Sequence, residues 1–207
     1  MKAIFTLTAL AMSLSLWGLN GKAASSMAKA KAPTNPSQTE TAVFAAGCFW
    51  GSEEFFRKIP GVVETRVGYA GGNKTNPDYE EVSSGKTGHA ESVEVKFDPK
   101  KVTYEQLLNS FFKMHDPTTL NRQGNDVGTQ YRSAIFFEND EQKTEAEKFK
   151  AKVEKSGAWK APITTEIKKA DHFYLAEEYH QKYLVKNPGG YDNHYVRNLS
   201  FDKPNTK

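Results

Sequence analysis

Apolar and polar residues follow two different periods along the chain, and the change between the periods predicts alternating strands and helices. Short apolar or strictly alternating runs bounded by turn residues are typical of strands. Five segments have this form: TAVFAAG (41–47), VVETRVGYA (62–70), HAESVEVKFD (89–98), YRSAIFF (131–137) and PITTEIKKA (162–170), the last of which we expect to be the final strand.

Apolar residues that recur every three or four positions predict four helices. They are GSEEFFRKI (51–59), the segment that follows Thr103, DEQKTEAEKFKAKVEKSG (140–157) and YLAEEYHQKYLVK (174–186). In the first helix we expect i,i+4 ion pairs from Glu53 to Arg57 and from Glu54 to Lys58.

The remaining segments are polar. Residues 71–88 and 118–130 are predicted to be long loops, and the chain from Tyr191 onward is predicted to be irregular. The alternation of strand and helix predicts a single α/β or α+β domain.

The N-terminal residues differ in character from the rest. Lys2 is followed by an apolar run to Leu19 and then by small residues, which is typical of a secretory signal peptide, here residues 1–23. Residues 24–40 are rich in Ala, Lys, Pro and Ser, which predicts a flexible linker before a folded domain at 41–207. We therefore expect an exported protein, periplasmic in a Gram-negative bacterium or secreted, without a stable membrane anchor.

The charge balance argues against a nucleic-acid partner. Lys and Arg number 28 against 25 Asp and Glu, and the formal charge of +3 falls once Lys2 and Lys22 leave with the signal peptide. No basic stripe remains that could follow a phosphate backbone. The pattern is silent on oligomeric state, and a monomer is the default expectation.

The chain has a single cysteine, Cys48, although exported proteins usually use cysteines in pairs. It is an inert buried thiol, an intermolecular link or a reactive thiol. A strand that runs into a helix through Gly47 would place the sulfur at a helix N-terminus, which predicts a lowered thiol pKa. Phe49 and Trp50 would supply apolar surface beside it, or would simply belong to the core.

A second candidate is Glu91, which shares one face of its predicted strand with Val93, Val95 and Phe97. A carboxyl group in apolar surroundings has a raised pKa and is a candidate general acid. The alternative is a glutamate at the strand end that reaches solvent.

The two long loops carry further candidates. Tyr79 lies in the first loop, and Asp126 and Tyr131 lie in or just after the second. Tyrosine hydroxyls could hold an oxygen that gains charge during a reaction.

The histidines do not form a metal motif. No pair has H-x-x-x-H spacing, and one cysteine cannot complete a zinc site, so we expect no metal and no bound cofactor. His180 and Tyr183 are expected to pack or cap within their helix. The histidines are His89, His115, His172, His180 and His194.

The segments around these candidates resemble the A-type peptide methionine sulfoxide reductases, over essentially the whole of residues 41–191. The matching motifs are GCFWGSEEFF, PGVVETRVGYAGG, NPDYEEVSSGKTGHAESVEVKFDP, HDPTTLNRQGNDVGTQYRSAIFF and AEEYHQKYL. The resemblance implies a two-layer α/β sandwich around a mixed sheet. It also implies reduction of the S epimer of methionine sulfoxide in proteins, and of free methionine sulfoxide.

The resemblance implies catalytic roles for five residues. Cys48 would attack the sulfoxide sulfur, and Glu91 would protonate the sulfoxide oxygen. Tyr79 and Tyr131 would hydrogen-bond that oxygen, and Asp126 would position the site or a water molecule. The products are methionine and a sulfenic acid on the cysteine.

The resemblance also implies that Phe49 and Trp50 form the pocket for the methyl group on the substrate's sulfur. Many relatives carry further cysteines that form an internal disulfide, and this chain has none. We therefore expect an external thiol to reduce the Cys48 sulfenic acid: a thioredoxin-like protein, a glutaredoxin with glutathione, or a small thiol.

Two other functions are compatible with a lone cysteine. A cell-envelope hydrolase or transpeptidase would pair Cys48 with a histidine base and form a thioester. A non-enzymatic domain would hold Cys48 as an inert buried thiol, and its replacement would change stability alone.

Overall fold

The computed structural model describes residues 39–202. The predicted signal peptide at 1–23 and nearly all of the predicted linker at 24–40 lie outside these residues. Within them, no helix is both long and apolar enough to cross a membrane.

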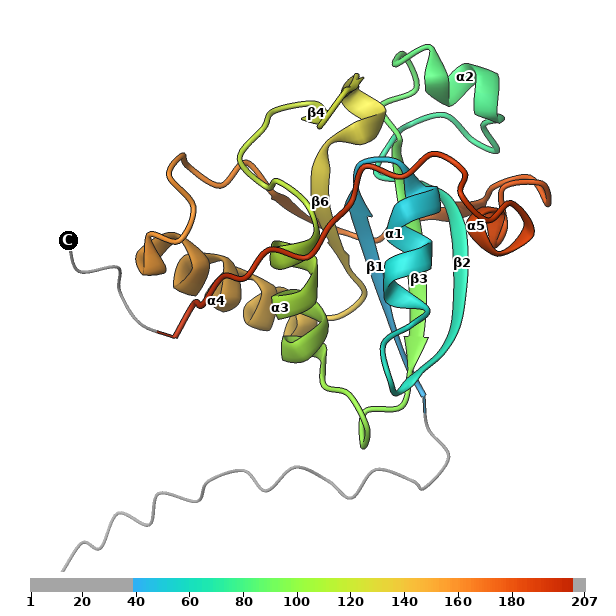
Figure 1. The fold of residues 1–207 in the computed structure, drawn as a ribbon. Coiled ribbons are helices and arrows are strands. Elements are labelled where there is room, and N and C mark those ends of the chain that lie inside the picture. Colours follow the sequence, from blue (N-terminus) through green and yellow to red (C-terminus); the bar gives the residue numbers. More distant parts are fainter. Residues whose placement is uncertain (1–38, 203–207) are drawn as a thin grey trace, which may run out of the picture. The chain divides into compact units, whose positions relative to one another are not determined.

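A six-stranded mixed sheet forms the centre of the fold, in the order β7-β6-β1-β3-β2-β8 (Figure 1). All neighbouring pairs are antiparallel except β6 with β7, which is parallel. The mixed α/β architecture predicted from the sequence is confirmed. The strands are β1 (Glu40–Ala46), β2 (Val62–Ala70), β3 (Ala90–Phe97), β6 (Ser133–Phe137), β7 (Glu166–Lys169) and β8 (Phe173–Leu175).

The long helices pack on one face of this sheet and enclose the main core. Phe44 of β1 stacks on Phe56 of α1 with ring centroids 5.0 Å apart and on Phe111 of α3 at 5.3 Å. The opposite face carries a smaller apolar cluster of Val43, Ala45, Ala70, Ala90, Ala134 and Phe136. The helices are α1 (Phe49–Phe56), α3 (Tyr104–Met114) and α4 (Asp140–Ser156).

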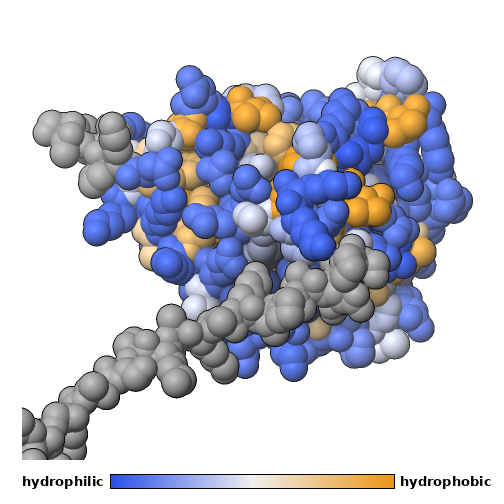
Figure 2. Space-filling model, turned by 90° about the horizontal axis from the view of Figure 1, so that it is seen from below, coloured by the Kyte–Doolittle hydropathy of each residue, from blue (hydrophilic) through white to orange (hydrophobic). Residues whose placement is uncertain are grey.

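Local sequence signals account for the ends and faces of these helices. Thr103 and Gln106 form a reciprocal capping box at the start of α3. Helix α4 buries Ala146, Phe149 and Val153 and leaves its charged residues outside. The face of the molecule seen in Figure 2 is accordingly mostly hydrophilic, with apolar residues in separate small patches.

The structure corrects one predicted ion pair in α1. Arg57 pairs with Glu54 at 2.5 Å, and Lys58 pairs with the same carboxylate. Glu53 instead points inward, where it accepts hydrogen bonds from Thr65 Oγ1 at 3.0 Å and from the backbone N–H of Lys182 at 2.7 Å. Tertiary contacts therefore override the i,i+4 spacing.

The predicted helix at 174–186 is also wrong. Strand β8 occupies 173–175, so 162–170 does not contain the final strand, and only α5 (Tyr183–Lys186) is helical. Tyr174 lies opposite Tyr69 in the sheet, and pairing with the edge of β2 replaces the helical hydrogen bonds that the local pattern favoured.

The two polar loops contain short elements that the sequence pattern did not indicate. In the first, α2 (Tyr79–Ser83) begins at a capping box of Asp78 and Glu81. The second contains a two-residue hairpin of β4 (Arg122–Gln123) and β5 (Asp126–Val127), followed by a 3₁₀ turn at Thr129–Tyr131.

The chain after α5 is irregular as far as Asp202, as predicted. In Figure 1 it crosses α1 and α3 toward α4. The Arg197 N–H donates to the Lys113 carbonyl at 3.0 Å, and the buried Phe201 ring meets Phe149 edge-on. This segment is thus held along its length.

Candidate active site

Cys48 lies in the turn between β1 and α1, as the N-cap residue of the helix. Gly47 has a φ of 94°, a left-handed conformation that side chains disfavour, and a Cβ there would lie 2.5 Å from Cγ of Gln123. The tight turn therefore directs the first N–H groups of α1 and the thiol toward the same end of the sheet.

The thiol faces a small cavity of ≈ 100 Å³. All seven residues singled out from the sequence line it, although they come from β1–α1, α2, β3 and the loop before β6. The full lining is Cys48, Phe49, Trp50, Tyr79, Glu91, Asp126, Tyr131 and Tyr191. Only Tyr191 was missed.

The predicted lowering of the Cys48 pKa is wrong for the protein without substrate. Burial raises the thiol pKa above its ordinary value, and the negative charges of Glu91 and Asp126 raise it further. The backbone N–H groups of Trp50 and Gly51 lower the thiol pKa, but by less than burial and the two carboxylates raise it. The helix N-terminus is present as expected, but desolvation of the buried thiol outweighs its effect on the pKa.

Glu91 is buried, with 2% of its surface exposed, so the alternative of a solvent-facing glutamate is wrong. Desolvation raises its pKa to about 8, although the Phe49 N–H donates to Oε2 at 3.0 Å and favours the charged form. The charge of Asp126 raises the pKa as well. Glu91 is therefore largely protonated at neutral pH.

Two tyrosines face the same cavity from α2 and from the 3₁₀ turn. Burial is the largest cause that raises the pKa of both Tyr79 and Tyr131, so each keeps its hydroxyl hydrogen. The Tyr79 backbone N–H donates to Oε1 of Glu177 at 2.9 Å, which fixes the start of α2.

Phe49 and Trp50 fit both interpretations of their role. Phe49 is buried in the main core and also lines the cavity. Trp50 is half-buried, stacks on Tyr183 with centroids 3.8 Å apart, and donates its indole N–H to His180 Nδ1 at 3.0 Å. His180 lies outside any helix, so the prediction that it packs within one is wrong.

The irregular C-terminal segment contributes a residue that the sequence reasoning missed. The Tyr191 hydroxyl donates to Asp126 Oδ1 at 2.9 Å, and Asn193 Nδ2 donates to Oδ2 at 2.9 Å. The only available signal was the density of hydrogen-bonding side chains in GGYDNH, which a structureless tail does not require.

The same segment supports the cysteine turn from outside the cavity. His194 Nε2 lies 2.7 Å from the Ala46 carbonyl oxygen, and its Nδ1 lies 3.0 Å from Asp192 Oδ1. A Cβ at Gly51 would approach Asp192 Oδ1 to 2.1 Å, so glycine there permits this close contact. Among residues 39–202, no group of three or more His, Cys, Asp or Glu side chains is placed to hold a metal ion.

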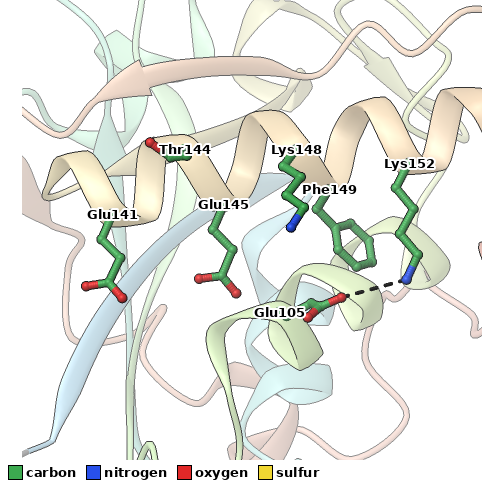
Figure 3. A pocket seen from close by; sticks show the side chains of 7 residues that line it. All are labelled: Glu105, Glu141, Thr144, Glu145, Lys148, Phe149 and Lys152. Carbon is green, nitrogen blue, oxygen red and sulfur yellow. Dashed lines mark ion pairs between the residues drawn. The ribbon is translucent and has the colours of Figure 1, made fainter. Parts of the chain in front are cut away.

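A larger hollow of ≈ 580 Å³ lies between α3 and α4, away from the predicted residues (Figure 3). Phe149 forms its floor, and the charged side chains around it include Lys152, whose Nζ lies 3.7 Å from Glu105 Oε1. No cysteine and no buried carboxyl group lines this hollow, whereas the smaller cavity brings Cys48 and the buried Glu91 together.

Known proteins are similar to this chain in sequence and in fold. A family model described as "Peptide methionine sulfoxide reductase" matches residues 40–207. The chain is 59% identical over 152 residues to "Peptide methionine sulfoxide reductase MsrA" of Methanothermobacter thermautotrophicus, which covers 73% of this chain and 90% of that protein.

Solved structures give the same likeness. Mxr1 from Saccharomyces cerevisiae in reduced form has a TM-score of 0.74 and 41% identity, covering 80% of this chain and 96% of that one. Mxr1 in complex with Trx2 has a TM-score of 0.53 and 29% identity, covering 80% and 94%.

Proposed function

The chain belongs to the peptide methionine sulfoxide reductase family of oxidoreductases, which reduce methionine sulfoxide to methionine, and from this premise we propose that it acts on the S epimer through a sulfenic acid on Cys48. The observation that carries the proposal is the meeting of the Cys48 thiol and the buried Glu91 carboxyl at one small cavity. Membership of this family sets aside the hydrolase and the non-enzymatic alternatives.

The proposed step transfers oxygen from one sulfur to another. As Cys48 Sγ bonds to the sulfoxide sulfur it loses its proton, and Glu91 gives a proton to the sulfoxide oxygen. The substrate S–O bond and the new bond between the two sulfurs then break as the protonated oxygen bonds to Sγ, which leaves methionine and a sulfenic acid on Cys48. The substrate sulfur gains two electrons, the Cys48 sulfur loses two, and the thiol proton restores Glu91.

The electrostatic interaction between Cys48 and Glu91 favours a protonated Glu91 beside a Cys48 thiolate. A negative Glu91 is one cause of the raised thiol pKa, so a protonated Glu91 makes the thiolate easier to form. The N–H groups of Trp50 and Gly51 then stabilise the thiolate, and the neutral hydroxyls of Tyr79 and Tyr131 are available to the sulfoxide oxygen.

A single turnover without reductant tests the proposal. Protein in excess is mixed with a peptide that carries either the S or the R epimer of methionine sulfoxide, and a sulfenic-acid reagent traps Cys48. We expect methionine peptide from the S epimer alone and one adduct on Cys48. Reduction of the R epimer, or reduction without an adduct, would overturn the proposed chemistry.

We further propose that an external thiol regenerates Cys48, since the chain has no second cysteine. A thiol would displace water from the sulfenic acid to form a mixed disulfide, which a second thiol then cleaves. A related protein has been solved with Trx2, which supports a thioredoxin-like donor over a glutaredoxin with glutathione or a small thiol. Steady-state turnover with each thiol donor ranks the three donors. An internal crosslink in the oxidised protein would contradict regeneration by an external thiol.

We also propose that the enzyme is exported and repairs oxidised proteins in the periplasm or outside the cell, as a monomer. The apolar run after Lys2 supports export. Fractionation of cells that express the full chain tests the location, and light scattering of the purified protein tests the oligomeric state.

A further inference from the structure

The segment Ala176–Lys182 lies beside the cavity and is held by single side chains rather than by regular structure. Gln181 accepts from the Val67 N–H at 2.9 Å and donates to the Val67 carbonyl at 2.9 Å, so it continues the edge of β2. The Lys182 N–H donates to the buried Glu53. These bonds fix the backbone on both sides of His180.

Glu177 fastens the same segment to the wall of the cavity. Its Oε2 accepts the Tyr69 hydroxyl at 2.8 Å, and its Oε1 accepts the Tyr79 N–H at 2.9 Å. Between Glu177 and Gln181, the His180 side chain is 1% exposed, and its ring lies 4.9 Å from that of Phe49 and 4.6 Å from that of Tyr79.

The hydrogen bond to Trp50 determines which nitrogen of His180 carries the proton. An indole N–H only donates, so Nδ1 must be the acceptor and the neutral ring must carry its hydrogen on Nε2. Within residues 39–202, that Nε2 has no hydrogen-bond partner, and it lies 3.9 Å from Oε2 of Glu177. The carboxylate thus faces the N–H end of the ring and favours this tautomer.

We propose that His180 is a positioning residue whose neutral ring holds the Trp50 indole in place as one wall of the site for the substrate's S-methyl group. The proposal rests on the proposed function, because it assigns the contact between Trp50 and substrate to that reaction. Trp50 also stacks on Tyr183 of the short helix α5 and packs against the main core, but these apolar contacts do not fix the direction of the indole N–H as a hydrogen bond does.

Protonation of His180 would break this arrangement, because a hydrogen on Nδ1 would point at the indole hydrogen. The titratable groups around the ring are Glu177, Tyr79 and Tyr179. Burial lowers the His180 pKa, and the charge of Glu177 opposes that shift. The contact therefore persists at neutral pH and weakens only below the ordinary histidine range.

Two substitutions separate positioning from packing. His180→Leu removes the acceptor and keeps an apolar side chain, while His180→Asn can place its amide oxygen where Nδ1 accepts. We expect the leucine variant to raise the KM for a methionine sulfoxide peptide about tenfold with little change in kcat, since ~1.4 kcal/mol is a factor of ten. The asparagine variant should recover most of that loss, and His172→Leu, at an exposed histidine, should leave KM unchanged.

A third variant covers the case in which His180→Leu does not fold. Trp50→Phe keeps an aromatic ring and loses the N–H, so its KM should be raised at pH 7 and should lack the rise that the wild-type KM shows at acid pH. An unchanged KM in His180→Leu, an asparagine variant as impaired as leucine, or the same acid rise in Trp50→Phe would overturn the proposal. Failure of the wild-type protein to reduce either epimer would instead overturn the proposed function.

Discussion

Two regions enclose the cavity at Cys48, and different interactions stabilise them. The β1–α1–β3 unit rests on packed apolar rings, such as Phe44 against Phe56. The segment 176–194 has little regular structure and depends on individual polar bonds, such as those of Gln181 to Val67. Apolar burial is spread over many contacts and has no direction, whereas each polar bond fixes one orientation. The first region therefore gives Cys48 and Glu91 a densely packed support, and the second sets the orientation of other side chains that line the cavity.

The largest effect should come from the sulfur itself. Cys48→Ser should abolish turnover because a hydroxyl group does not accept the oxygen from a sulfoxide, and the chain has no other thiol. Peptide mass analysis after prolonged incubation measures this. The urea midpoint should stay close to that of the wild type, and residual turnover would show that the chemistry lies elsewhere.

Glu91→Gln should slow the reductive step by about 10²–10⁴-fold, since the amide has no acid proton to give. Because the working form is protonated and the pKa is raised to about 8, the wild-type single-turnover rate should fall as pH increases through that value. The variant should lack this fall. Rapid-quench measurements from pH 6 to about 10 test both points, and an unchanged rate would remove Glu91 as the acid.

Phe44→Ala tests the apolar region directly. The ring is fully buried between α1 and α3, and its loss should lower the free energy of unfolding by about 3–5 kcal/mol. Urea unfolding at pH 7 measures the change. In protein that remains folded, the KM for substrate should be close to the wild-type value, because no wall residue of the cavity is replaced.

Gln181→Ala tests the polar region. Compared with Phe44→Ala, it should lower the free energy of unfolding less and raise the KM for substrate more. It leaves the N–H of Val67 without its acceptor, while the Val67 carbonyl keeps the N–H of Ala176, and the loss should cost about 1–3 kcal/mol of unfolding free energy. The KM should increase because His180 is the adjacent residue. A loss of stability as large as that of Phe44→Ala with an unchanged KM would erase the distinction between the two regions.

Tyr191→Phe should have the smallest effect. It removes one donor to Asp126 while Asn193 still holds the other carboxylate oxygen. A loss of ~0.5–1.5 kcal/mol corresponds to a decrease in kcat/KM of about two- to tenfold. Steady-state kinetics measure it, with Tyr195→Phe, at a largely exposed tyrosine, as the control that should behave as wild type.

The two regions also differ in how well their structure follows from local sequence. The strand at 62–70 was predicted to the residue, and Glu91 was placed on the correct face of β3, because a period of two is visible within a few residues. The segment 174–186 has helical periodicity but pairs with β2 and binds Glu53 through Lys182. Contacts between distant residues decided that outcome, and no local window contains them.

The order of most strands and helices, the single thiol, and the motifs around Glu91, Tyr79, Tyr131 and Asp126 can all be found in the sequence without a structure. Tertiary structure alone decided that the Cys48 pKa is raised, because desolvation depends on what surrounds the thiol and not on its place at a helix N-terminus. Tertiary structure also brings the Trp50 indole within hydrogen-bonding distance of His180, which is 130 residues away in the sequence. A hydrogen bond of fixed length between side chains so far apart in sequence exists only once the whole sheet and its edges have formed.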